Sequence, residues 1–224
     1  MKTDQIKKFL TIILLLGIIN MNNSALATPL DTSIMSTIIA HTQTAKKTDQ
    51  IILVVDHNLS LWNKTANGWQ IDFETYCGYG KNNFSSDRHA GDKTTPIGSF
   101  PILYAFGLID KPDTSMTYKK ITPKSYLSGE AKTYNQWIES DEYIDGEHLI
   151  DYYQYKYAMN IGFNIDPVVY GRGAAIFLHC KSHNRWWTAG CVSVVEEDMI
   201  KLFQKCHDGV YMIIVPNAEE ISSF

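Results

Sequence analysis

The sequence predicts a mainly β fold, a sandwich or barrel of mixed strands with one helix late in the chain. Of the 224 residues, 13 are Tyr, 9 are Phe and 5 are Trp, and this aromatic content favours strands. Short apolar runs recur between turns rich in Gly, Pro and Asn. A clear helical period is found only near the C-terminal end.

Residues 1–27 have the pattern of a secretory signal peptide. Three lysines precede the apolar run 9–19, and Ala25-Leu26-Ala27 matches the small-x-small cleavage pattern. The run is short for a membrane span, and an uncleaved anchor is the alternative. We therefore expect cleavage near Ala27, export to the periplasm or cell envelope, and no stable membrane span in the mature chain.

The domain is expected to cover residues 50–216. Residues 28–49 precede it as an N-terminal arm or short helix, and residues 217–224 follow it as a C-terminal tail. The apolar run Ile51–Val55 predicts a buried strand. Two further apolar runs flank Thr65-Ala66-Asn67-Gly68, and Asn-Gly in this setting predicts a β-hairpin.

The middle of the chain is less regular. The Pro and Gly of the loop 91–98 predict a rigid turn before a strand at 99–104. Residues 108–147 are polar with weak periodicity, which predicts a long functional loop such as a lid or binding flap. Residues 155–161 predict another strand, and a further apolar run, which ends at His179, predicts one more.

The last segment changes period. Met199, Leu202, Phe203 and Cys206 recur as on one face of an amphipathic helix. Ser193 and Glu196 have the spacing of a capping box for this helix, and Gly209 fits its C-terminal stop. Cys206 is then a small core residue. The apolar run 210–215 predicts a closing strand.

Charge and cysteine spacing exclude several classes of function. The net charge is −4 and only three arginines occur, Arg88, Arg172 and Arg185, so no basic patch for nucleic acid is predicted. The four cysteines form no CxxC pair, which argues against a structural zinc site. We expect no metal, no organic cofactor and a monomer. Whether Cys77, Cys180 or Cys206 forms a disulfide is left open.

The stretch "AIFLHCKSHNRWWTAGCVS" (175–193) holds the candidate site. Cys191 follows Gly190 and precedes the predicted helix, so a close backbone approach, free amides and the helix N-terminus would stabilise a thiolate and lower the thiol pKa. His179 ends a strand and is the candidate base.

The alternatives for these residues are a buried thiol with a core histidine, or His183 in the flap as the base. A zinc site of His179, His183 and Cys191 lacks a fourth ligand. The Cys180 side chain should face the opposite side of the strand, although its carbonyl can orient His179.

The segment 173–194, "GAAIFLHCKSHNRWWTAGCVSV", resembles the signature of the L,D-transpeptidase catalytic domain family of the YkuD/ErfK type: an apolar strand ending in His, a variable flap, then Ser/Thr-x-Gly-Cys. "GDKTTPIGSF" (91–100) is similar to the family's Thr-Pro-x-Gly-x-Phe turn. The similarity extends from about residue 51 to 215, and the chain matches the branch with Thr-Ala-Gly-Cys-Val.

This resemblance implies a β-rich fold and a cysteine acyltransferase that acts on peptidoglycan stem peptides. Cys191 is then the nucleophile and His179 the general base. The Cys180 carbonyl orients the imidazole, and the amides around Gly190 and Cys191, in the turn that begins at Thr188, form the oxyanion hole. The enzyme would release terminal D-alanine and resolve the thioester with an amine, giving a 3→3 crosslink. Water as acceptor would make it an L,D-carboxypeptidase.

The chain departs from the family pattern at two positions. Cys180 stands where many members have Gly or Ser, and Ser193 replaces an arginine two residues after the cysteine. Arg185, in the flap, is the nearest replacement in sequence. Together with Trp187 and His183 of the same flap it is a candidate substrate-binding residue. A sortase-like enzyme needs an arginine after the cysteine, and papain-like peptidases place Cys before His. A non-catalytic cell-wall-binding module is the alternative from another class.

Overall fold

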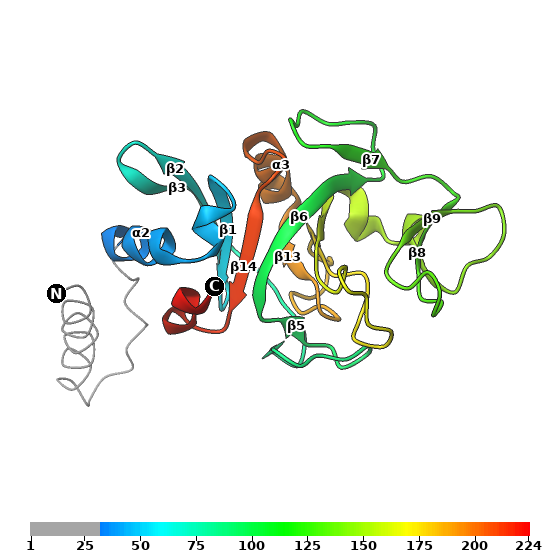
Figure 1. Ribbon diagram of the computed structural model, residues 1–224. Helices are drawn as coiled ribbons and strands as arrows, with labels where there is room; N and C mark the ends of the chain where they lie inside the picture. The colour runs from blue at the N-terminus through cyan, green and yellow to red at the C-terminus, as the bar shows by residue number, and fades with distance from the viewer. Residues whose placement is uncertain (1–31) are drawn as a thin grey trace. The chain divides into compact units, whose positions relative to one another are not determined.

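The computed structural model describes residues 32–224, so the expected signal segment 1–27 lies outside the described residues. The fold is mainly β, as the sequence predicts, and is built on one curled mixed sheet (Figure 1). The nine strands of this sheet are β1 (Gln50–Val55), β2 (Asn58–Thr65), β3 (Gly68–Tyr76), β6 (Gly98–Gly107), β7 (Tyr118–Lys120), β11 (Ala158–Ile161), β12 (Phe177–Cys180), β13 (Val192–Val194) and β14 (Tyr211–Val215).

Smaller elements surround the sheet. Two α-helices are present in the described residues, α2 (Thr32–His41) and α3 (Glu196–Lys205). A separate three-stranded sheet and a two-stranded sheet consist of β8 (Ser125–Ser128), β9 (Trp137–Glu139), β10 (Gly146–His148), β4 (Phe84–Ser85) and β5 (Thr95–Pro96). The 3-10 helices are η1 (Thr44–Lys46), η2 (Leu149–Asp151), η3 (Tyr153–Lys156) and η4 (Ala218–Ser223). No helix within residues 32–224 is long and apolar enough to cross a membrane.

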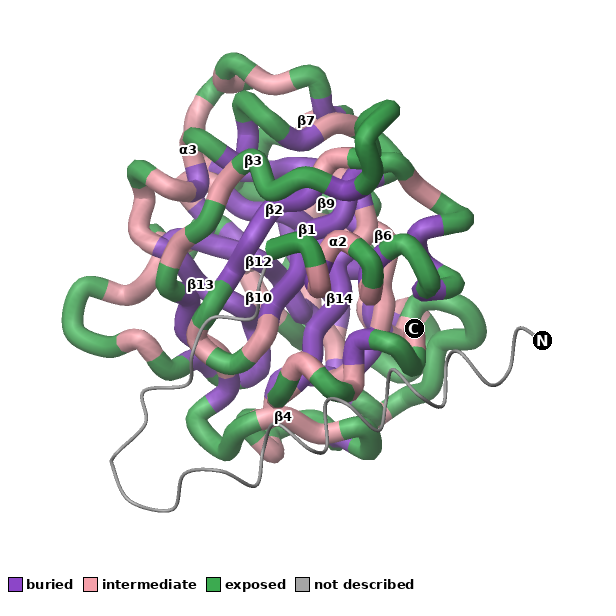
Figure 2. Tube along the Cα trace, turned by 90° about the vertical axis from the view of Figure 1, so that its left-hand side faces the viewer, coloured by how far each residue is buried: buried purple, intermediate pink, exposed green. Residues whose placement is uncertain are grey.

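The main sheet has the order β13-β12-β11-β6-β14-β1-β2-β3, with β7 paired to β6. Strands β1 and β14 pair in parallel at its centre, as do β12 and β13 at one edge. The central strands are buried on both faces, which explains their unbroken apolar runs (Figure 2). In contrast, β3 is largely exposed at the other edge.

Each face of the sheet has its own apolar cluster. Ile52 and Val54 of β1 pack in the cluster that contains the buried side of α3. Ile51 and Leu53 pack in the cluster that contains Met35 and Ile39 of α2. Because successive residues of a strand face opposite sides, α2 and α3 cover opposite faces of the sheet. A third cluster lies beside β12 and contains Phe177 and Cys191.

The predicted strands near residues 51–55, 99–104, 177–179 and 210–215 are confirmed. The hairpin is confirmed as well: β2 and β3 pair from Thr65 opposite Gly68, which has a φ of +96°. Glycine adopts this conformation without the steric penalty that other residues pay.

Three local predictions differ from the structure. Residues 108–147 are not an unstructured loop, since they contain β7, β8, β9 and part of β10. Tyr155 and Lys156 belong to a 3-10 helix rather than to the following strand. The capping box is also wrong: Val195 is the N-cap of α3, with no side-chain cap, and the Ser193 hydroxyl instead donates to the Trp186 carbonyl.

Candidate active site

Cys191 and His179 lie on neighbouring strands at the edge of the main sheet. His179 is in β12, and Cys191 immediately precedes β13. In the parallel register of these strands, His179 is opposite Ser193. Cys191 is two residues before Ser193, so its side chain and that of His179 point to the same face. The Cys180 thiol, by contrast, packs in the cluster that contains α3.

The Cys191 thiol is buried and hydrogen-bonded to backbone. The residue is 8% exposed, and its Sγ donates to the Ala175 carbonyl at 3.2 Å. The Phe177 amide donates to the same sulfur at 3.4 Å. Burial, and then the negative charge of Glu147, raises the pKa of Cys191 to about 12. At neutral pH the group is therefore a thiol, not a thiolate.

The His179 imidazole is held in one orientation. Its Nδ1 is 2.8 Å from the Cys180 carbonyl oxygen. A carbonyl can only accept, so Nδ1 carries the proton and Nε2 has the free lone pair. Burial lowers the pKa of His179 to about 4, although the bond to Cys180 acts in the opposite direction. The ring is thus neutral at pH 7 and able to accept a proton at Nε2.

The expected lowering of the Cys191 pKa by the helix N-terminus is wrong. Three residues of β13 separate Cys191 from the N-cap Val195, so the cysteine is not in the first turn of α3. That first turn also contains Glu196, Glu197 and Asp198, which satisfy the helix dipole themselves. Burial dominates, and the pKa moves upward.

The turn before Cys191 is closed by Thr188. The Thr188 hydroxyl donates to the Cys191 carbonyl and accepts from the Gly190 amide, at 2.6 and 3.0 Å. The Thr95 hydroxyl donates to the Gly190 carbonyl at 2.8 Å. The Gly190 amide is thus occupied within the turn, and Thr188 fixes the backbone that presents the thiol.

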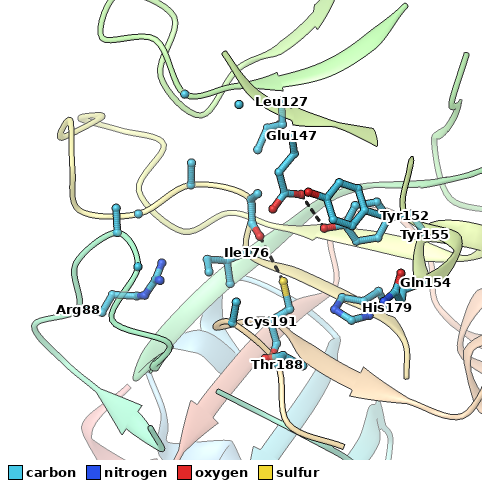
Figure 3. Close-up of a pocket in the computed structure, with 18 of the residues that line it drawn as sticks. Arg88, Leu127, Glu147, Tyr152, Gln154, Tyr155, Ile176, His179, Thr188 and Cys191 are labelled. Carbon is cyan, nitrogen blue, oxygen red and sulfur yellow. Dashed lines mark hydrogen bonds between the residues drawn. The ribbon is translucent and has the colours of Figure 1, made fainter. Parts of the chain in front are cut away.

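A cavity of about 550 Å³ opens over these residues (Figure 3). Its floor contains His179, Thr188 and Cys191. Its opposite wall comes from the region predicted as a lid, since Leu127, Ser128, Gly129, Tyr134, Gly146 and Glu147 all line it. In Figure 3, Glu147 lies above the Cys191 sulfur, with Arg88 and His179 to either side.

The structure brings two of the three candidate substrate-binding residues to this cavity. Arg185 and Trp187 line it, and the Arg185 guanidinium is 4.1 Å from the centre of the Trp187 ring. His183 does not line it. Its ring stacks on Tyr153 at 4.6 Å, beside a second cavity of about 650 Å³. His183 is therefore not placed to act on Cys191.

Sequence reasoning missed Arg88, Glu147 and Tyr155, which all line the cavity. The Tyr155 hydroxyl donates to the Glu147 carboxylate at 2.6 Å, and burial raises the pKa of Glu147. Glu147 lies in the segment with weak periodicity, and Tyr155 lies in a segment predicted only as a strand, so no pattern marked either residue as part of the site. For Arg88 there was a signal, its position three residues before the Gly91–Phe100 motif in a chain with three arginines.

All four cysteines are free and buried, which answers the open question about disulfides for this structure. Cys206 caps the C-terminal end of α3 and is fully buried, as its predicted core role requires. Within residues 32–224, no three His, Cys, Asp or Glu side chains are grouped so that they could hold a metal ion.

The family model of the L,D-transpeptidase catalytic domain, YkuD, matches residues 49–215. No curated protein matches the chain.

The solved structures that match the chain include Bd1075 of Bdellovibrio bacteriovorus, with 15% identity, a TM-score of 0.43, and coverage of 81% of this chain and 55% of that one. The helical cell shape determining protein Pgp2 of Campylobacter jejuni has 14% identity and a TM-score of 0.44, and the match covers 87% of this chain and 60% of that one. An L,D-transpeptidase mutant of Enterococcus faecium has 12% identity and a TM-score of 0.38, and the match covers 75% of this chain and 50% of that one. The chain thus spans about half to three-fifths of the length of these structures.

Proposed function

The chain belongs to the L,D-transpeptidase catalytic domain family, and from this premise we propose that it is a cysteine acyltransferase of peptidoglycan stem peptides. Cys191 is the nucleophile and His179 the general base. The substrate is a tetrapeptide stem whose third residue is a diamino acid and whose fourth is D-alanine.

In the first step the Cys191 sulfur attacks the carbonyl carbon of the third residue. The thiol proton passes to Nε2 of His179 as the C–S bond forms. The C–N bond to D-alanine then breaks, and the same proton goes to the leaving amine. A thioester on Cys191 and free D-alanine result, and His179 is neutral again.

In the second step the side-chain amine of a neighbouring stem attacks the thioester. His179 accepts a proton from that amine and returns it to the Cys191 sulfur. The product is a 3→3 crosslink and the free enzyme. Water in place of the amine gives a tripeptide, which is L,D-carboxypeptidase activity.

One observation carries this proposal: the Cys191 thiol and an imidazole oriented by the Cys180 carbonyl point into the same cavity. Thr188 holds the turn so that the thiol and the Cys191 amide face the substrate carbonyl, and this amide is the proposed oxyanion donor. Arg185 and Trp187 are proposed to form one wall of the donor groove.

The proposed place of action is the cell envelope, where peptidoglycan is found. The signal segment expected at residues 1–27 would direct the chain there.

The test is mass spectrometry after incubation of the mature protein with purified disaccharide-tetrapeptide, beside Cys191→Ala. A dimer that lacks one D-alanine and requires Cys191 establishes 3→3 transpeptidation. A tripeptide without dimer, again dependent on Cys191, establishes carboxypeptidase action through the same thioester.

Unchanged substrate, together with failure of a carbapenem to acylate Cys191, contradicts the enzymatic proposal. That pair of results supports a non-catalytic cell-wall-binding module. Carbapenem acylation is read as a mass increase that is absent from Cys191→Ala.

A further inference from the structure

The guanidinium of Arg88 is buried in the wall of the cavity that contains Cys191. Arg88 is 3% exposed and lines this cavity together with Gly173, Ala175 and Cys191. Arginine is rarely so deeply buried unless its charge is paired. The side chain lies against the ring of Phe163, with Cζ 5.4 Å from the ring centre.

The hydrogen bonds of Arg88 are incomplete. Its Nε donates to the Thr94 carbonyl at 3.1 Å, and Nη2 is 3.6 Å from an Asp92 carboxylate oxygen. Nη1 has no partner, and it is the one buried side-chain nitrogen or oxygen in residues 32–224 of which this is true. An unpaired buried donor is costly, so a ligand or a water molecule is expected to supply its acceptor.

Asp92 forms an ion pair with Arg88, but its oxygens are hydrogen-bonded elsewhere. Its carboxylate accepts from the His89 and Thr94 amides at 2.6 and 2.8 Å, and from the Thr94 hydroxyl at 2.9 Å. These bonds hold the loop and leave Asp92 beyond hydrogen-bond distance of the guanidinium. Asp92 thus balances the charge of Arg88, while Nη1 keeps no acceptor.

Two glycines admit the guanidinium beside the thiol. A Cβ at Gly173 would lie 2.0 Å from Nη1, and a Cβ at Gly190 would lie 3.2 Å from Nη2. Gly190 is the residue before Cys191, so the guanidinium lies beside the backbone that precedes the nucleophile. Any larger side chain at Gly173 would displace Arg88, which makes this glycine part of the same arrangement.

We propose that Arg88 binds the terminal carboxylate of the acyl donor, the carboxylate of the D-alanine that leaves. The inference rests on the proposed function. Only the amide nitrogen and one Cα separate that carboxylate from the scissile carbonyl. It therefore lies close to the thiol while the donor stem is bound. A planar guanidinium with an unpaired nitrogen binds a carboxylate in a directed, charge-assisted way. Arg88 thus selects stems with a free C-terminus.

The first test compares two reagents of nearly equal size at Cys191, iodoacetate and iodoacetamide. In both, the sulfur displaces iodide, but only iodoacetate has a carboxylate. The measured quantity is the rate constant for iodoacetate divided by that for iodoacetamide, normalised to the same ratio for free cysteine. It reports anion binding beside the thiol, and any change in the thiol pKa cancels because both reagents react with the thiolate. The alkylated residue is identified by peptide mass spectrometry.

Arg88→Gln should lower this ratio about tenfold or more, and Arg88→Lys should retain part of it. Arg172→Gln is the matched control, because Arg172 also lies over Phe163, at 5.9 Å, but is exposed and does not line the cavity. An unchanged ratio in Arg88→Gln overturns the inference. A loss in Arg185→Gln alone also overturns it and assigns the anion site to Arg185.

The second test separates this inference from the proposed function. Donor tetrapeptides ending in a carboxylate or a carboxamide are compared by kcat/KM. The wild type should prefer the acid by about 10- to 100-fold, and Arg88→Gln should lose most of this preference. Turnover with the same preference in Arg88→Gln rejects the role of Arg88 and keeps the function. No turnover by the wild type, with an iodoacetate preference that needs Arg88, rejects the function and keeps the anion site.

Discussion

At the scale of single residues, the proposed nucleophile and base are both neutral at physiological pH. Burial raises the pKa of Cys191 to about 12 and lowers that of His179 to about 4. A preformed thiolate–imidazolium pair would require the two opposite shifts. The proton transfer to His179 therefore accompanies the attack on the substrate carbonyl, as in serine hydrolases, instead of preceding it.

This pair predicts that the activity persists to an unusually low pH. Because His179 has a pKa of about 4, it stays neutral and able to accept a proton at any pH above that value. We expect kcat/KM for the tetrapeptide to be nearly constant from about pH 5 to 8 and to fall only near pH 4. Near-UV circular dichroism at each pH controls for unfolding. A limb near pH 6.5, the ordinary value for histidine, would contradict the neutral buried base.

Glu147 predicts a change in thiol reactivity. Its carboxylate raises the pKa of Cys191, after burial. Glu147→Gln removes that negative charge and keeps an oxygen that can accept from Tyr155. We expect iodoacetamide to alkylate Cys191 roughly two- to tenfold faster at pH 8, because more thiolate is present.

The control for this variant is Glu219→Gln, a carboxylate in η4 that does not line the cavity. Equal or slower alkylation in Glu147→Gln would show that Glu147 does not act on the thiol through its charge.

At the scale of elements, the loop that ends in β5 fixes the turn before Cys191. The Thr95 hydroxyl donates to the Gly190 carbonyl and accepts from the Gly80 amide, both at 2.8 Å. One buried side chain thus connects three segments that are distant in sequence. This is the structural reason for the Thr in the Thr-Pro-x-Gly-x-Phe turn of this chain.

Thr95→Val tests this connection. Valine has the same shape but leaves the Gly190 carbonyl and the Gly80 amide without their partner, which should destabilise the fold by about 1–3 kcal/mol. We expect slower carbapenem acylation of Cys191 as well, since the turn loses its support. Thr65→Val, at an exposed position of the hairpin, is the control. Urea unfolding and acylation rates measure the two effects, and a variant like wild type in both would remove Thr95 from this role.

The elements found from the sequence are those with a strong local pattern. The central strands are apolar on both faces, and the hairpin has an Asn-Gly turn, so both follow from the residues alone. The strands β8, β9 and β10 are three or four residues long and interrupted by polar side chains. Their pairing depends on contacts with distant residues, which periodicity does not encode.

The same distinction applies to the site. Cys191 and His179 are close in sequence, at a glycine turn and an apolar strand, so the sequence alone predicts both. Arg88 and Glu147 reach the cavity from other parts of the chain and are joined to it only by the fold. The helix effect on Cys191 failed because three residues of strand, invisible to the spacing argument, precede α3.

At the scale of the whole molecule, the main sheet separates the apolar cluster that contains α2 from the cavity that contains Cys191. The cluster that contains α2 lies on one face of β1, whereas Cys191 belongs to the cluster beside β12. Residues of α2 contact no part of the cavity over the thiol. The described residues before β1 are therefore expected to hold the sheet together without touching the reaction.

Ile39→Ala tests this separation. Ile39 is fully buried in the cluster with Trp62 and Trp69, so truncation leaves a cavity and should cost about 2–5 kcal/mol of unfolding free energy. Urea unfolding measures this loss, and Ile38→Ala, at a half-buried position of the same helix, should lose less. At temperatures where the variant stays folded, iodoacetamide should alkylate Cys191 at the wild-type rate. A stable but slowly reacting Ile39→Ala protein would mean that α2 acts on the site through the sheet, because only a shift of the central strands could carry the change from one face to the other.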